Sequence, residues 1–196
     1  QGFDKEICLA VSEHYLPTGA NSKIPKKSYS VALALADKLD TLTGFFGVGL
    51  KPSSSKDPYA LRRMAVGMIK IILENNVKIK VNNLIKESFQ IYQNQKIDFD
   101  FKKTHAEILD FMYERFKSYM KEKGIRNDII ESSVSTYNID DILKVYKKAL
   151  TLNKFISKEL GTDLIFSYKR ASNILESFSD KLELEELGSV DPGLFK

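Results

Sequence analysis

Cysteine and histidine are scarce in this chain of 196 residues, which holds one cysteine, two histidines and no tryptophan. Because Cys8 is alone, no disulfide can form within the chain and no zinc site can be built from several cysteines. Any metal site or nucleophilic chemistry would have to use His14, His105 and the carboxylates. A single cysteine also suits a reducing compartment, so we expect a cytoplasmic protein.

Long apolar runs are missing as well. The longest uncharged apolar stretch, residues 41–50, carries three glycines and is far too short to span a membrane. Charged residues at Asp4, Lys5 and Glu6 stand where a secretory leader would be apolar. We therefore expect no membrane partner, and because the first residue is Gln1, we expect a chain that has been trimmed or excised.

The composition that is present is that of a globular, mildly basic protein. Hydrophobic residues make up 43% of the chain, the formal net charge is +4 and the sequence pI is about 8.9. The apolar fraction excludes a disordered chain. The small positive charge permits an acidic partner such as RNA but does not identify one.

Apolar residues recur at helical spacing in nearly every segment, which predicts an all-α fold. Segment 77–81 alternates apolar and lysine residues and is expected to be an extended connector. The helix-start signals are Asp57-Pro58, a capping-box pattern from Thr104 to Glu107, Asn138 and Asp163. Helices are expected over residues 4–15, 29–46, 58–74, 83–92, 104–123, 127–133, 138–160 and 163–178.

The polar segment 93–103 is the best candidate for a subdomain boundary. It would separate a helical domain at residues 1–95 from a second helical unit at 104–180, and the two could share one continuous core. Residues 181–196 are interpreted as an acidic linker or tail.

Two features of the first domain invite a chemical interpretation. Asp37 and Asp40 are three residues apart, near one helical face, and with His14 they could bind a metal. The alternative is a polar helix face, because a hard-cation site needs more oxygen ligands than two side chains supply. Gly44, Gly47 and Gly49 suggest a phosphate-binding loop, but their spacing fits neither the dinucleotide-binding fingerprint nor the P-loop. Close helix packing and a turn are the simpler explanation.

Basic residues surround the loop before the helix at residues 58–74. They could meet the phosphates of RNA, with backbone amides at the helix start adding to the site, or they could form an ordinary solvated face. Lys169 and Arg170 form a second, smaller basic site on the last helix. The neighbouring Tyr168 could stack on an RNA base or could be an ordinary core residue. The candidate RNA-binding residues are Lys51, Lys56, Arg62, Arg63, Lys70, Lys169 and Arg170.

Several blocks of the sequence resemble the β subunit of the bacterial heterotetrameric glycyl-tRNA synthetase. The two longest are ALADKLDTLTGFFGVGLKP at residues 34–52 and SKDPYALRRMAVGMIKII at 55–72. Shorter ones are Glu13–Pro17 (EHYLP), Arg115-Phe116, residues 121–130, residues 168–175 and Val190-Asp191-Pro192. The resemblance covers most of the chain in order, and it implies an interior piece of the subunit.

This resemblance carries expectations about activity and partners. In that family the α subunit holds the aminoacylation core and uses ATP with magnesium, whereas the larger β subunit recognises tRNA(Gly). The chain would thus be a non-catalytic part of a glycine–tRNA ligase that helps position tRNA(Gly), with no cofactor of its own. Its partners would be tRNA(Gly) and the α subunit, and contacts between β subunits are also compatible with the resemblance.

The family also implies a fold, a helical bundle related to HD phosphohydrolases followed by a second helical segment. Asp37 and His14 resemble two of the HD metal-site motifs, but no His-Asp dipeptide occurs in the chain. We therefore expect no metal, and a structural role for Asp37. Two alternatives stay open: a metal-dependent HD-type nucleotide phosphohydrolase, and a purely structural scaffold between domains.

Overall fold

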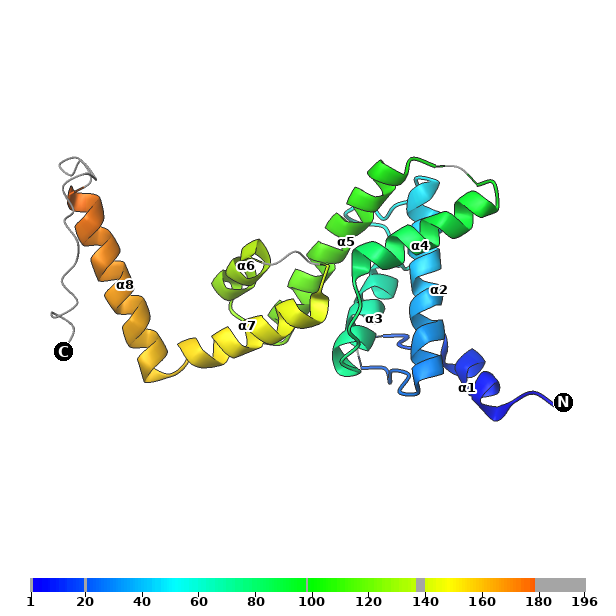
Figure 1. Cartoon of the computed structure of the whole chain (residues 1–196), viewed down its shortest axis with the longest axis horizontal. Coiled ribbons are helices and arrows are strands. Elements are labelled where there is room, and N and C mark those ends of the chain that lie inside the picture. The colour runs from blue at the N-terminus through cyan, green and yellow to red at the C-terminus, as the bar shows by residue number, and fades with distance from the viewer. Residues whose placement is uncertain (1, 20, 98, 137–139, 179–196) are drawn as a thin grey trace. The chain divides into compact units, whose positions relative to one another are not determined.

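The computed structural model describes residues 2–19, 21–97, 99–136 and 140–178, which are drawn as coloured ribbon in Figure 1. These residues form eight α-helices and no strand, which confirms the all-α prediction. Within the same ranges, no helix is both long and apolar enough to cross a membrane. The helices are α1 (Lys5–Glu13), α2 (Ser28–Gly47), α3 (Leu61–Glu74), α4 (Val81–Asn94), α5 (Phe101–Glu122), α6 (Asn127–Thr136), α7 (Ile142–Ile156) and α8 (Glu159–Phe178).

The chain divides into two compact units, Gln1–Thr151 and Leu152–Lys196. The core of the first unit lies where α2, α3 and α5 pack against one another, with α1 and α4 packed on α2. Leu42, Ile69 and Phe116, one from each of the three central helices, are fully buried. Helices on both sides of segment 93–103 therefore share a core.

The start of α3 differs from the prediction. Pro58 lies in a turn and the helix begins at Leu61, because Ala60 adopts a left-handed conformation with φ of 55° just before it. Asp57 still caps the helix as expected. Its two carboxylate oxygens accept hydrogen bonds from the backbone N–H groups of Leu61 and Arg62, each at 2.9 Å.

Two other predicted helix starts are wrong. Asp100 caps α5 by accepting a hydrogen bond from the Lys103 N–H at 3.0 Å, so Thr104 is buried inside the helix instead of capping it. Asp163 lies inside α8, which begins at Glu159. The fourth start signal, Asn138, lies outside the described residues, as does the acidic tail.

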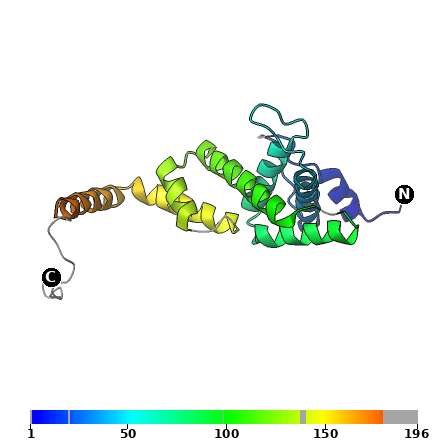
Figure 2. The ribbon, with the colours of Figure 1, turned by 90° about the horizontal axis from the view of Figure 1, so that it is seen from above.

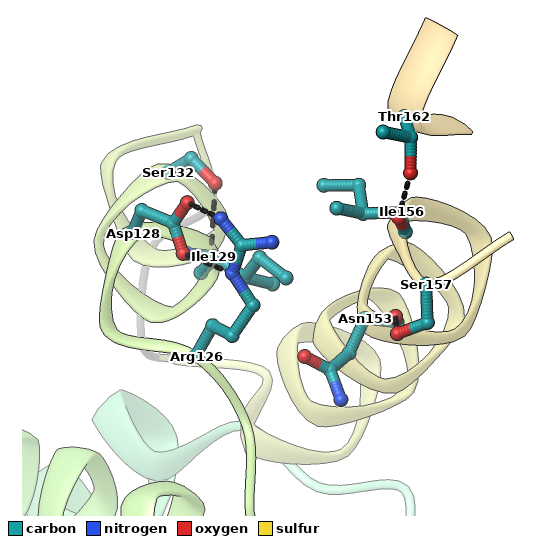
Figure 3. Close-up of polar contacts among 8 residues, drawn as sticks. All are labelled: Arg126, Asp128, Ile129, Ser132, Asn153, Ile156, Ser157 and Thr162. Carbon is teal, nitrogen blue, oxygen red and sulfur yellow. Dashed lines mark hydrogen bonds and ion pairs between the residues drawn. The ribbon is translucent and has the colours of Figure 1, made fainter. Parts of the chain in front are cut away.

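Gly161 allows the turn between α7 and α8. A Cβ atom on Gly161 would lie 2.2 Å from the backbone oxygen of Phe155, so the two backbones approach too closely for a side chain. Around this turn, the Thr162 hydroxyl donates to the Ile156 carbonyl at 3.3 Å (Figure 3). The second unit thus has a defined turn, while most of its side chains on α8 are exposed.

The glycines at the end of α2 have the structural roles that the sequence suggested. A Cβ on Gly44 would lie 2.5 Å from the Tyr92 hydroxyl oxygen, and a Cβ on Gly47 would lie 2.7 Å from the Phe99 ring. Gly49 has a φ of +78°, which L-residues rarely adopt. The three glycines therefore serve close packing and a turn.

The connection from α5 to α6 has its own local support. Arg126 and Asp128 form an ion pair with an N–O distance of 2.7 Å, and the Ser132 hydroxyl donates to the Ile129 carbonyl at 3.1 Å (Figure 3). This ion pair is exposed, so we assign it little stability. The burial of Ile129 and Ile130 is what fixes α6 against the unit.

Candidate nucleic-acid interface

The loop between α2 and α3 projects from the helical bundle (Figure 2) and carries two of the predicted RNA-binding residues. Lys51 forms an ion pair with Glu107 of α5. Lys56 is exposed, and its backbone and that of Ser53 are linked by a hydrogen bond from the Ser53 N–H to the Lys56 carbonyl at 3.0 Å. The loop is thus a closed turn that presents Lys56 to solvent.

Two backbone amides in the first turn of α3 are already hydrogen-bonded within the protein. Asp57 already accepts hydrogen bonds from the N–H groups of Leu61 and Arg62. The Arg62 guanidinium, in turn, donates to the backbone carbonyls of Ser53 and Ser54. Arg62 therefore holds the loop against the helix, and the Leu61 and Arg62 amides, which the sequence suggested for a phosphate, donate to Asp57.

A cleft of about 430 Å³ opens between α3, α5 and the residues Pro17, Gly19 and Asn21, all within the first unit. Lys70 lies on the α3 side, where its amine donates to the Ser22 carbonyl at 2.9 Å and pairs with Glu74 at 3.9 Å. Among the described residues that line the cleft, Glu122 is the one carboxylate. The basic residues that line it are Arg62, Arg63 and Lys70 of α3 together with Arg115 of α5 and Lys123 after its end.

Arg63 is the predicted residue with the most accessible charge in this cleft. Its side chain is exposed, and no ion-pair partner for it is found among the described residues. Arg62 and Lys70, by contrast, are half-buried and hydrogen-bonded to backbone carbonyls. The structure therefore brings three predicted residues together but leaves one of them most accessible to a ligand.

Two residues of the cleft were missed in the sequence. Arg115 is half-buried, with its guanidinium carbon 5.6 Å from the centre of the Phe111 ring, and Lys123 places its amine 5.3 Å from the centre of the Tyr119 ring. Their spacing of eight residues on one helical face was a usable signal. It could not reveal the α3 residues on the opposite wall, which precede Arg115 by 45 residues or more in the sequence.

Tyr119 forms part of the cleft wall and is itself buried. Burial, with smaller contributions from Tyr146, Glu74 and Glu122, raises the pKa of Tyr119 to about 12. The hydroxyl therefore stays protonated at neutral pH and can donate a hydrogen bond.

The remaining predicted RNA-binding residues lie elsewhere. Lys51 and Lys56 belong to the projecting loop and do not line the cleft. Lys169 and Arg170 are exposed on α8 in the second unit, and the neighbouring Tyr168 is 73% exposed instead of buried in a core.

His14 and Asp37, two of the three residues considered as metal ligands, lie beside a buried lysine. Lys38 is 2% exposed and its amine donates a hydrogen bond to the backbone carbonyl of His14 at 2.9 Å. Burial lowers the pKa of Lys38, and the adjacent Asp37 carboxylate opposes that shift. His14 directs its Nδ1 atom to the Val11 carbonyl. Among the described residues, no group of three or more His, Cys, Asp or Glu side chains could hold a metal ion.

Asp37 and Asp40 line a second hollow, an apolar groove of about 1080 Å³. It lies between α1, α2, α4 and residues 75–79, and its exposed apolar side chains include Val11, Leu33 and Ile91. The Tyr92 hydroxyl donates to the Asp40 carbonyl at 3.1 Å. No sequence pattern indicated this groove, because its walls come from four separate segments.

Comparison with known proteins identifies the family. The family model described as glycyl-tRNA synthetase beta subunit matches residues 1–135. The chain is 36% identical over 180 residues to the glycine–tRNA ligase beta subunit of Ruegeria sp. (strain TM1040), covering 92% of this chain and 25% of that protein. The corresponding protein of Clostridioides difficile (strain 630) is also 36% identical, over 93% of this chain and 26% of that protein.

These matches agree with the blocks that carried the resemblance in the sequence. A third relative, the glycine–tRNA ligase beta subunit of Cereibacter sphaeroides (strain ATCC 17029 / ATH 2.4.9), is 36% identical over 97% of this chain and 27% of its own length. The chain spans about a quarter of the length of these relatives. Since the family model covers more than half of the chain and the relatives align with nearly all of it, this chain belongs to the glycyl-tRNA synthetase β subunit family.

Proposed function

We propose that this chain is a non-catalytic portion of the β subunit of a cytoplasmic glycine–tRNA ligase, and that it helps to bind and position tRNA(Gly). Glycylation itself, with ATP and magnesium, is assigned to the α subunit, which is the expected protein partner. Family membership supports the enzyme, and the basic cleft supports the contact with RNA.

The observation that carries the proposal is the convergence of five basic residues and one acidic residue on a single cleft. Arg63 is exposed in the cleft, and Lys56 is exposed on the loop that precedes α3. Phosphate groups of RNA bind such surfaces through charge-assisted hydrogen bonds and through the release of counterions. The arrangement favours backbone contacts, which position an RNA without reading its bases.

Positioning is a sufficient role for a surface that holds no reacting group. An enzyme gains rate when its substrate is bound in a productive orientation, and a small misplacement of that substrate lowers the rate strongly. Contacts with the tRNA backbone would orient tRNA(Gly) relative to the α subunit. Removing these contacts should therefore weaken tRNA binding and leave activation of glycine by ATP unchanged.

A titration of the α–β enzyme with tRNA(Gly) at two salt concentrations tests the proposal. We expect binding to weaken as salt rises, and Arg63→Ala to weaken it further at the lower concentration. Lys5→Ala is the matched control, because it removes one exposed positive charge from α1, outside the cleft. Equal binding by Arg63→Ala and the unchanged enzyme would argue against this face as an RNA contact.

A scaffold role is the second candidate, and a specific observation favours it. The Arg62 guanidinium donates a hydrogen bond to the Ser53 carbonyl, and the Lys70 amine donates one to the Ser22 carbonyl. Part of the basic face therefore maintains the fold. If tRNA binding is unchanged in Arg63→Ala while Arg62→Ala lowers thermal stability, the scaffold interpretation is the better one.

A further inference from the structure

We propose that the cleft holds the sugar-phosphate backbone of a single RNA strand between two walls, with Arg63 on α3 and Arg115 and Lys123 at the α5 side. This inference rests on the proposed function and deepens it, because it names the chemical form of the ligand and adds two binding residues. The contact lies in a cleft and not on the projecting loop.

The two walls are held in a fixed relation by the core. Helices α3 and α5 pack directly against each other (Figure 1), and the side chains of Phe116 and Met120 of α5 and of Met68 and Ile69 of α3 are almost completely buried. A ligand between the walls therefore meets charges that are already in place. Such preorganisation lowers the entropy cost of binding.

Arg115 is the cleft residue with a hydrogen-bond donor that lacks an acceptor among the described residues. Its Nε atom is buried, and among the described residues no hydrogen-bond acceptor is found for it. A buried donor without an acceptor is costly, and such groups usually have a partner in the functional state. Packing over the Phe111 ring holds the guanidinium plane, and a planar guanidinium fork matches two oxygens of a phosphate.

The size of the cleft selects the form of the RNA. A volume of about 430 Å³ lies at the lower end of small-molecule sites, enough for a phosphate with its sugar and too small to enclose a double helix. Glu122 at the same cleft would repel a second closely spaced phosphate. A single strand whose phosphates pass one at a time satisfies both conditions.

A free nucleotide such as ATP also carries phosphates, so it is the alternative ligand for the same basic side chains. The extended strand is favoured because a further exposed basic residue, Lys56, lies outside the cleft on the loop that leads into α3. A strand can meet these charges in succession, whereas one nucleotide can meet only those within its own length.

The test compares variants of the complete glycine–tRNA ligase in binding to tRNA(Gly) across a range of salt. Arg115→Met approximates the shape of the side chain and removes its charge, and Lys123→Gln removes the charge at an exposed position. Lys121→Gln is the matched control, since it is exposed near the end of α5 and does not line the cleft. We expect each cleft variant to bind about tenfold more weakly. The slope of log affinity against log salt should become shallower by about 0.7 to 0.9 for each phosphate that the variant no longer neutralises.

Lys123→Gln keeps the test decisive if Arg115→Met disturbs folding, because Lys123 is exposed.

A short single-stranded oligoribonucleotide should compete with tRNA(Gly), and a duplex of the same length or ATP should compete far less. If Arg63→Ala weakens tRNA binding while Lys123→Gln behaves like Lys121→Gln, the proposed function stands and the two-walled cleft is wrong. If none of these variants changes tRNA binding, both proposals fail. Competition by ATP that depends on Arg115 would identify a nucleotide site in place of a strand site.

Discussion

The first unit carries two hollows of opposite character, the basic cleft against α3 and the apolar groove against α2. The cleft concentrates arginine and lysine around about 430 Å³, while the groove of about 1080 Å³ is lined mainly by aliphatic side chains with Asp37, Asp40 and Glu87 among them. Helices α2 and α3 pack against each other between the two. One helix pair thus separates a surface suited to phosphates from one that phosphates would avoid.

The residues between the two hollows explain how they stay distinct. Lys38 of α2 is buried and bonds to the His14 carbonyl, and a Cβ atom on Gly67 of α3 would lie 3.2 Å from its Cε atom. The amine of Lys38 thus lies inside the protein, while a third, small hollow of about 80 Å³ is lined by Asp37, Lys38 and Arg63, and Arg63 also lines the cleft.

Charge reversal within the cleft should have the largest effect. In Arg63→Glu/Arg115→Glu the two walls repel a phosphate, so we expect tRNA(Gly) affinity to fall by about a hundredfold or more, measured by filter binding at low salt. The matched change at the groove, Glu87→Lys, should leave the affinity within about twofold of its original value. A similar loss from both changes would mean that the general charge of the protein, and not the cleft, controls binding.

Filling the space between the hollows should lower stability. Gly67→Ala places a Cβ within 3.4 Å of Lys38 and Pro17, so the neighbours must shift. Overpacking should cost about 1 to 3 kcal/mol, and alanine gains about 1 kcal/mol over glycine within a helix, so we expect a net loss of about 1 kcal/mol in the free energy of unfolding, measured by urea denaturation. Gly19→Ala is the control, because a Cβ there would meet nothing within 4 Å. Equal stability of both variants would show that α2 and α3 are less closely packed than described.

The free energy of unfolding should depend on alkaline pH through Tyr119, the buried residue of the cleft wall. The pKa of Tyr119 is raised to about 12 from an ordinary value of 10.0, so between these values the folded state keeps a proton that the unfolded state loses. The stability that this proton provides is complete below the ordinary pKa and is lost as pH rises through the raised one. Tyr119→Phe should therefore change how the free energy of unfolding varies over this alkaline range, measured by urea denaturation at several pH values. Tyr15→Phe, which removes an exposed hydroxyl from the same unit, is the control and should leave that variation as it is.

The smallest effect is expected from the groove. Leu33 and Ile91 are exposed by 39% and 54%, so Leu33→Ser/Ile91→Ser should change the free energy of unfolding by about 0.5 kcal/mol or less per substitution. tRNA(Gly) affinity should not change. A clear loss of α–β assembly on size-exclusion chromatography would instead show that the groove is a protein-contact surface.

Local pattern was enough to predict most helices, because their apolar spacing, the Asp57 cap and the glycines at the end of α2 are local signals. It failed where two start signals competed. Thr104 fitted a capping box, yet Asp100 caps the helix and Phe101 packs on Phe89 at a ring separation of 4.5 Å. Tertiary contacts of this kind are not visible in the order of residues.

The candidate site was predictable only in part, for a related reason. Arg62, Arg63 and Lys70 are close in sequence and share one helix, so their proximity follows from helical spacing. Arg115 and Lys123 join them only because α5 folds back onto α3. The burial of Lys38 was also unpredictable, since a lysine in a helical pattern is ordinarily exposed.

The most direct measurement of the central claim is a site-specific photocrosslink between this chain and tRNA(Gly). A photoreactive phenylalanine derivative in place of Ser118, an exposed residue that lines the cleft, is compared with the same derivative in place of Ile91, at the groove, in the complete enzyme. The two-walled cleft predicts crosslinks to single-stranded tRNA nucleotides from position 118 and none from position 91. Crosslinks from position 91 alone, or equal yields from both positions, would contradict it.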